Sequence, residues 1–218
     1  MLEYMKKNKA GMLGGLAGAM ALGAGTYLML KMMKEKKERK SVGKVRREYY
    51  MDPGYKEHID LSLSESERRH ALISDVAYTA ALSLPMGDVY EGFIRTTFKL
   101  ADISDAVFID FFGHEVSDIS INGQDVLPQD VFRNQRILLP EQFQRKGRNE
   151  LSIRFRNVYA TNGFGIHTFK DPEDGQQYLY SHCEAFRAHK MFPMFDQPDL
   201  KATLKVITLT PKEWVTLF

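Results

Sequence analysis

The residues that could do chemistry gather in one stretch near the C-terminus, YLYSHCEAFRAHKMFPMFDQPDLKA, residues 178–202. These 25 residues include two histidines, one cysteine, one glutamate and two aspartates. Side chains of these types can hold a metal, act as a nucleophile or bind a charged substrate. Their density is typical of an active site or of the remnant of one.

Metal binding and nucleophilic catalysis are both poorly supported within this stretch. His182, Glu184 and His189 are spaced by two and five residues, which fits neither one strand face nor one helix face. Cys183 is the single cysteine, and no His–Asp arrangement can be assigned to it from the sequence. We therefore predict no metal, no other cofactor and an unreactive, buried thiol.

Composition excludes several classes of protein. The 218 residues carry a net charge of +2, which is too small to indicate a nucleic-acid partner. One cysteine cannot form an intrachain disulfide, so a disulfide-stapled secreted fold is ruled out. A hydrophobic content of 44% is enough for a globular core.

A membrane anchor is predicted near the N-terminus. Residues 10–30 contain no charge, and a helix of this length spans about 30 Å, the hydrocarbon thickness of a bilayer. A cleaved signal, a mitochondrial targeting helix and a buried core helix fit this glycine-rich, uniformly apolar run less well. The predicted organisation is a short basic N-terminus (1–9), a single transmembrane helix (10–30), a charged linker (31–62) and a folded domain (63–218).

The glycines and lysines of the N-terminal region suggest its contacts. Small residues four apart form a stripe that lets a second membrane helix approach closely, and the stripe here consists of Gly11, Gly14, Gly15 and Gly18. The lysines from Lys31 to Lys40 are placed to meet lipid headgroups. The more basic C-terminal flank predicts a folded body on the cytoplasmic or matrix side.

The remaining sequence predicts a mainly β fold. A capping box from Ser64 to Glu67 begins a short helix that continues through Ala71 and Leu72. Short runs rich in β-branched and aromatic residues follow, separated by turn signals such as Asn122-Gly123, and predict an antiparallel β-sandwich. The expected strands are DVAYTAALSLP, GFIRTTFKL, AVFIDFF, DISING and NELSIRF, with a final strand pair or bent strand over residues 205–210 and 214–218.

From residue 63 to residue 218 the chain resembles the N-terminal β-sandwich domain of zinc aminopeptidases of the alanyl/puromycin-sensitive type. The resemblance lies in SESERRHALISDVAYTAALSL, YEGFIRTTFKL, ISING, RILLP and KGRNELSIRF, and above all in the distinctive FPMFDQPDLKA. It implies that Glu184 corresponds to a glutamate that binds the free α-amine of a peptide. His182 stands where many members have glutamine, so the resemblance gives Glu184 and His182 as the substrate-binding residues of a vestigial site. Asp196 is expected to tie strand to loop.

The zinc-binding motif of that family is missing from this sequence. The family holds zinc with a His-Glu-x-x-His helix, in which two histidines one turn apart share a face. Here only His114 precedes a glutamate, and position 118 is Asp118. A Gly-Ala-Met-Glu-Asn substrate strand is also missing. We therefore predict that the chain is not an enzyme by itself.

Three functional hypotheses follow. The first is a non-catalytic subunit of a membrane complex, in the mitochondrial inner membrane and of respiratory-chain type, with the body on the matrix side. In this hypothesis the partners are other subunits, bound through the membrane helix and an open edge of the sandwich. The second is the substrate-binding half of a split zinc aminopeptidase, and the third is a module that binds peptide N-termini.

Overall fold

The computed structural model describes residues 61–217. Within that range, the protein has no helix both long and apolar enough to cross a bilayer. The predicted anchor at 10–30 and its glycines Gly11, Gly14, Gly15 and Gly18 lie outside the described residues. So do the lysines from Lys31 to Lys40, and all of these assignments stay predictions.

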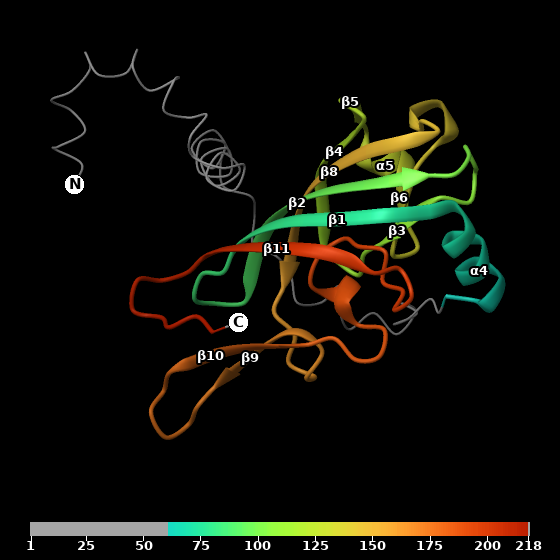
Figure 1. Ribbon diagram of the computed structural model, residues 1–218. Helices are drawn as coiled ribbons and strands as arrows, with labels where there is room; N and C mark the ends of the chain where they lie inside the picture. The colour runs from blue at the N-terminus through green and yellow to red at the C-terminus, as the bar shows by residue number, and fades with distance from the viewer. Residues whose placement is uncertain (1–60, 218) are drawn as a thin grey trace, which may run out of the picture. The chain divides into compact units, whose positions relative to one another are not determined.

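The described chain is mainly β, as the sequence predicts, and contains three sheets (Figure 1). The largest has six strands in the order β11-β1-β2-β8-β4-β5, namely β1 (Ile73–Ser83), β2 (Val89–Leu100), β4 (Glu115–Ile121), β5 (Gln124–Val126), β8 (Gly147–Val158) and β11 (Ala202–Leu209). The second has the order β3-β7-β6, with β3 (Phe108–Asp110), β6 (Phe132–Arg133) and β7 (Arg136–Leu138). The third is a hairpin of β9 (Gly165–Lys170) and β10 (Gln177–His182). Short helices complete the domain: α4 (Leu63–Leu72), α5 (Pro128–Val131), η3 (Glu141–Phe143) and η4 (Ala188–Lys190).

Two details of the predicted antiparallel sandwich are wrong. The large sheet is mixed, because β11 runs parallel to β1, with Val76 opposite Ala202. A parallel pair cannot be joined by a tight turn, and β1 and β11 are separated in the chain by strands β2 to β10. Residues 214–217 form no strand, so the predicted final strand pair or bent strand is reduced to β11 alone.

The core lies against one face of the six-stranded sheet and includes residues of the three-stranded sheet. On β2, every second residue from Tyr90 to Leu100 is buried, which is the period-two alternation expected of a strand with one face inward. Gly92 lies opposite Phe155 of β8 in this register. A Cβ atom on Gly92 would come within 2.2 Å of the Phe155 ring, so the glycine makes room for the aromatic side chain.

The capping box of α4 lies two residues before the predicted position. Ser62 is the N-cap residue, and its hydroxyl accepts a hydrogen bond from the Glu65 backbone N–H at 3.3 Å. The Glu65 carboxylate accepts from the Ser62 backbone N–H at 2.9 Å and from the Arg136 guanidinium of β7 at 2.5 Å. The Arg136 hydrogen bond is the main cause that lowers the pKa of Glu65 from 4.5 to about 2.

Replacing Glu65 by glutamine tests this ion pair while leaving a cap acceptor in place. About a third of the Glu65 side chain is exposed, so solvent screening limits the expected loss of unfolding free energy to about 1 kcal/mol at pH 7. Because the folded pKa is lowered, the contribution is complete above pH 4.5 and disappears as the pH falls toward 2. Urea unfolding of both proteins at pH 7, 4 and 2.5 should show the difference shrinking, and a constant difference would contradict the assignment.

Gly92→Ala should destabilise the domain by about 2 kcal/mol, because the added methyl group overlaps the Phe155 ring. Phe155→Leu creates space at the same place, so the double variant should lose less than the sum of the two single losses. Chemical unfolding of the four proteins measures this coupling. Strict additivity would show that the ring does not determine the need for glycine.

Candidate functional site

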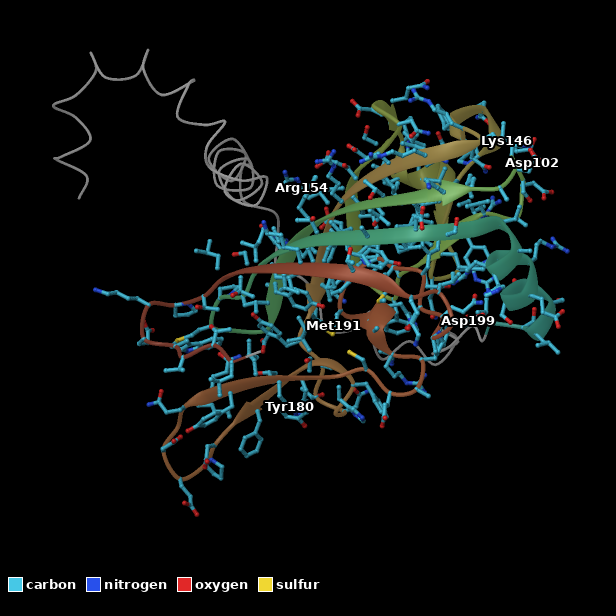
Figure 2. The ribbon with its side chains drawn as sticks, in the orientation of Figure 1. Asp102, Lys146, Arg154, Tyr180, Met191 and Asp199 are labelled. Atoms are coloured by element: carbon cyan, nitrogen blue, oxygen red, sulfur yellow. The ribbon has the colours of Figure 1, made fainter. Side chains whose placement is uncertain are left out.

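The hairpin β9–β10 carries one edge of the candidate site. Figures 1 and 2 show it projecting from the six-stranded sheet, with Tyr180 on its second strand. Cross-strand partners share a face, and one face presents Tyr178 beside Phe169, Tyr180 beside His167, and His182 beside Gly165. The rings of His167 and Tyr180 lie 4.7 Å apart. The face therefore forms an aromatic strip that ends at His182, the last residue of β10.

Glu184 follows directly after this strip. Its side chain is 92% exposed, whereas that of His182 is 49% exposed. The Nε2 atom of His182 lies 4.0 Å from the Oε2 atom of Glu184. The structure thus brings together the two residues that the family resemblance gives as substrate-binding, and it leaves the Glu184 carboxylate accessible to a ligand.

Phe164, at the start of the hairpin, organises the side chains around this pair. The His182 ring stacks on it with a centroid separation of 5.8 Å and an interplanar angle of 21°. The Arg187 guanidinium lies 5.1 Å from the Phe164 centroid, and the Lys190 ammonium lies 5.7 Å from it. Such cation–π contacts are favourable, so Phe164 stacks on His182 and holds Arg187, and it shares Lys190 with Phe112, whose centroid lies 4.7 Å from the ammonium.

Beneath the site, a chain of buried polar contacts holds the segment that follows Glu184. The Asp196 carboxylate accepts from the His189 backbone N–H at 3.0 Å and lies 2.7 Å from His189 Nδ1. The Asp196 backbone N–H donates to Asp110 of β3 at 3.2 Å, and Arg69 of α4 donates to Asp110 at 2.7 Å. The expectation that Asp196 ties strand to loop is confirmed, and His189 faces this network rather than a ligand.

The structure supports an unreactive Cys183. Its side chain is half-buried, and its Sγ atom lies 3.1 Å from the Sδ atom of Met191. Burial, with a smaller effect of the Asp196 charge, raises the pKa of the Cys183 thiol. The thiolate that nucleophilic chemistry requires is therefore disfavoured.

The residues that the structure describes do not fit a zinc ion. Across residues 61–217, no three His, Cys, Asp or Glu side chains gather as a metal would need. The His189 ring pairs with Asp196, and the carboxylate that the described residues place beside His182 is that of Glu184. No hydrolytic step is therefore assigned to this part of the chain.

The sequence did not predict the hairpin or the residues around Phe164. The signals were present: an Asp-Gly pair at 174–175 follows one short run, and Tyr178, Tyr180 and His182 alternate in the next. Arg187 and Lys190 carried no comparable signal. They meet at Phe164 only because the chain turns back through η4 after Glu184.

This arrangement defines a class: a mainly β domain that presents a carboxylate at the end of a projecting hairpin. Residues 77–217 match the family described as Peptidase M1 N-terminal domain, and the chain belongs to that family. Aminopeptidase N of Streptomyces lividans is 32% identical over 161 residues, which cover 72% of this chain and 19% of that protein. Probable aminopeptidase 1 of Sulfurisphaera tokodaii is 28% identical over 117 residues, which cover 54% of this chain and 14% of that protein. The matched part is thus less than a fifth of the length of either relative.

A solved structure supports the same fold. Native leukotriene A4 hydrolase from Saccharomyces cerevisiae superposes with a TM-score of 0.52 and 18% sequence identity. The superposition covers 75% of this chain and 27% of that one. At this level of identity the likeness concerns the fold, and the fold alone does not assign an activity.

Asp196→Ala should lower the free energy of unfolding by about 3 kcal/mol, since it removes the buried carboxylate that accepts from the His189 backbone N–H and pairs with the His189 ring. Asp196→Asn keeps an acceptor and should cost clearly less. Urea unfolding measures the stability, and hydrogen exchange at the His189 amide reports the local opening. A loss below about 1 kcal/mol for the alanine variant would show that the network does not hold this segment.

Proposed function

We propose that this domain binds the free α-amino group of a peptide through Glu184. It thereby provides the substrate-binding wall of a zinc aminopeptidase whose metal is held elsewhere. The observation that carries the proposal is the 92% exposed Glu184 carboxylate at the end of the hairpin. Among the described residues, its ion-pair contact is with His182 at 4.0 Å, which is too long for a strong hydrogen bond.

The physical match between site and ligand is direct. An ammonium group offers three N–H donors, and a carboxylate that accepts from it forms a charge-assisted hydrogen bond. The two relatives are named aminopeptidase N and probable aminopeptidase 1, and aminopeptidases act at peptide N-termini. Their names therefore support a peptide with a free α-amine as the ligand. A zinc ion bound outside the described residues would supply an activated water, while this domain would hold the amine and orient the peptide.

The membrane hypothesis is a separate proposal. A subunit role in a membrane complex, with an inner-membrane location, depends on residues 10–30 and on the lysines after them. Family membership favours peptide recognition over that role, because it concerns the folded domain and adds nothing about a respiratory assembly. The two proposals are compatible, since a membrane-tethered domain could still bind peptides.

Glu184→Gln should weaken the binding of an unmodified peptide by about tenfold, because it removes the charge that pairs with the ammonium. The probe is Ala-Ala-Ala-Lys with a fluorophore on its lysine, measured by fluorescence anisotropy at pH 7. The N-acetylated peptide should bind weakly to both proteins. Stability should not change, because the Glu184 side chain is almost fully exposed.

Glu173→Gln is the matched control. It makes the same change of charge at an exposed position in the turn of the same hairpin, and it should leave binding unaltered. Equal affinity for the free and acetylated peptides in the wild-type protein would overturn the proposal.

The catalytic part of the proposal has its own test. The purified chain with zinc should release no product from alanyl-aminocoumarin, since its described residues gather no metal ligands. A chelator-sensitive release from a co-purified complex that is lost in Glu184→Gln would support the split enzyme. Tight binding of the free peptide with no release from any complex would favour a module that only recognises peptide N-termini.

A further inference from the structure

Strand β11 forms one border of the six-stranded sheet (Figure 1), and among the described residues it pairs only with β1. The Leu84 backbone N–H donates to the Leu209 carbonyl oxygen at 2.8 Å, so the backbone of Leu209 faces β1. Successive residues of a strand direct their backbone groups to opposite sides. The N–H and C=O groups that face away from β1 are therefore those of Ala202, Leu204, Val206 and Thr208. Such an edge is a template on which a further strand can pair.

The core-facing row of side chains continues onto β11, but the protein covers it less completely there. Tyr78 and Ala80 of β1 are buried, and their partners on β11 are Leu204 and Val206. Leu204 is 53% exposed, although it lies beside Tyr78, which is 5% exposed. A neighbouring strand with apolar side chains on this face would remove part of Leu204 from water, which is favourable.

The charge of this edge indicates which partner it fits. Residues 201–212, KATLKVITLTPK, contain three lysines and no acidic residue. Lys205, near the centre of β11, is exposed, and its partner on β1 is the neutral Thr79. If two copies of β11 paired antiparallel about an axis near the strand centre, their Lys205 side chains would lie opposite or diagonal to each other and repel. Lysine on this edge thus disfavours self-pairing and favours a partner strand that carries a carboxylate.

We propose that β11 binds an extended, acidic peptide segment of a partner protein as an additional antiparallel strand. Main-chain hydrogen bonds to the outward groups of β11 supply affinity, apolar side chains cover Leu204 and Val206, and a carboxylate pairs with Lys205. Because the backbone of Lys205 faces β1, this residue occupies a non-hydrogen-bonded position of the new pair, where opposed side chains approach most closely. None of these groups belongs to the proposed amine site around Glu184.

The test compares two peptides by fluorescence anisotropy with the full chain at pH 7. The first is Thr-Val-Thr-Val-Glu-Val-Thr, acetylated at its N-terminus and carrying a fluorophore at its C-terminus, and the second has lysine in place of the glutamate. Acetylation removes the free α-amine, so a charge-assisted contact with Glu184 does not contribute. The Kd of the glutamate peptide should be about fivefold lower, because the cross-strand pair with Lys205 changes from attractive to repulsive in the lysine peptide.

Lys205→Glu should reverse the order of the two affinities, since it reverses the charge that faces the peptide. Lys212→Glu is the matched control, because it makes the same change at an exposed position after the end of β11. It should keep the wild-type order.

The backbone contacts are tested on the glutamate peptide itself. Methylation of the nitrogen of its central valine removes a donor that faces β11 and should abolish binding. Methylation of the glutamate nitrogen, which faces away from β11 in this register, should leave most of the affinity. Equal losses in the two methylated peptides would contradict strand addition.

Absence of binding by either peptide, equal affinities in the wild-type protein, or an unchanged order in Lys205→Glu would overturn the proposal. So would a wild-type dimer in sedimentation velocity that Thr208→Pro abolishes, because a second copy of β11 would then occupy the edge. That substitution removes an outward N–H and leaves the groups that pair with β1 in place. Circular dichroism confirms that each variant is folded. These outcomes leave the preference of Glu184 for a free α-amine unaffected, so the two proposals fail separately.

Discussion

The burial of two carboxylates, Asp110 and Asp196, is the constraint on which the arrangement of the domain depends. Each is less than a tenth exposed, and an unpaired charge at that depth would cost several kcal/mol. The Asp110 carboxylate pairs with Arg69 of α4 and accepts a hydrogen bond from the backbone N–H of Asp196. The Asp196 carboxylate accepts a hydrogen bond from the backbone N–H of His189. Three segments far apart in the sequence must therefore come together. The backbone of Asp110 strengthens the junction by exchanging hydrogen bonds with Met194 in both directions.

This junction explains why an exposed carboxylate can be positioned at the end of a hairpin. Glu184 lies between β10 and the segment that the buried network holds, so its backbone is restrained on both sides. Restraint of the backbone reduces the conformational freedom that binding would otherwise remove. The two histidines of residues 178–202 differ in their surroundings. His189 is buried and satisfied by Asp196, whereas His182 is half exposed and keeps its polar atoms at the surface.

Local patterns predicted much of the fold, and long-range contacts determined what they missed. Asn122 and Gly123 both have positive φ and connect β4 to β5, as an Asn-Gly hairpin signal predicts. For the start of α4 the capping box is predicted from Ser64 to Glu67. The structure forms it from Ser62 to Glu65, where Glu65 also meets Arg136 of β7, a partner 71 residues away. The parallel pairing of β11 and the convergence of Arg187 and Lys190 on Phe164 are likewise tertiary, so no local pattern encodes them. Glu184 and His182 were identified by family resemblance, and their separation required the structure.

Peptide recognition and permanent docking make opposite demands on the hairpin. A stable docking interface would cover the aromatic strip, whose members Phe169, Tyr178 and Tyr180 are about half exposed in this domain. Glu184 continues directly from that strip, so a partner that covered the whole strip would desolvate the carboxylate without supplying an ammonium. Such burial is unfavourable unless the partner brings a cation of its own. A partner compatible with amine binding must therefore contact the strip near Phe169 and leave the end at His182 open. The position of the charge at one end of the apolar face, rather than at its centre, permits this division.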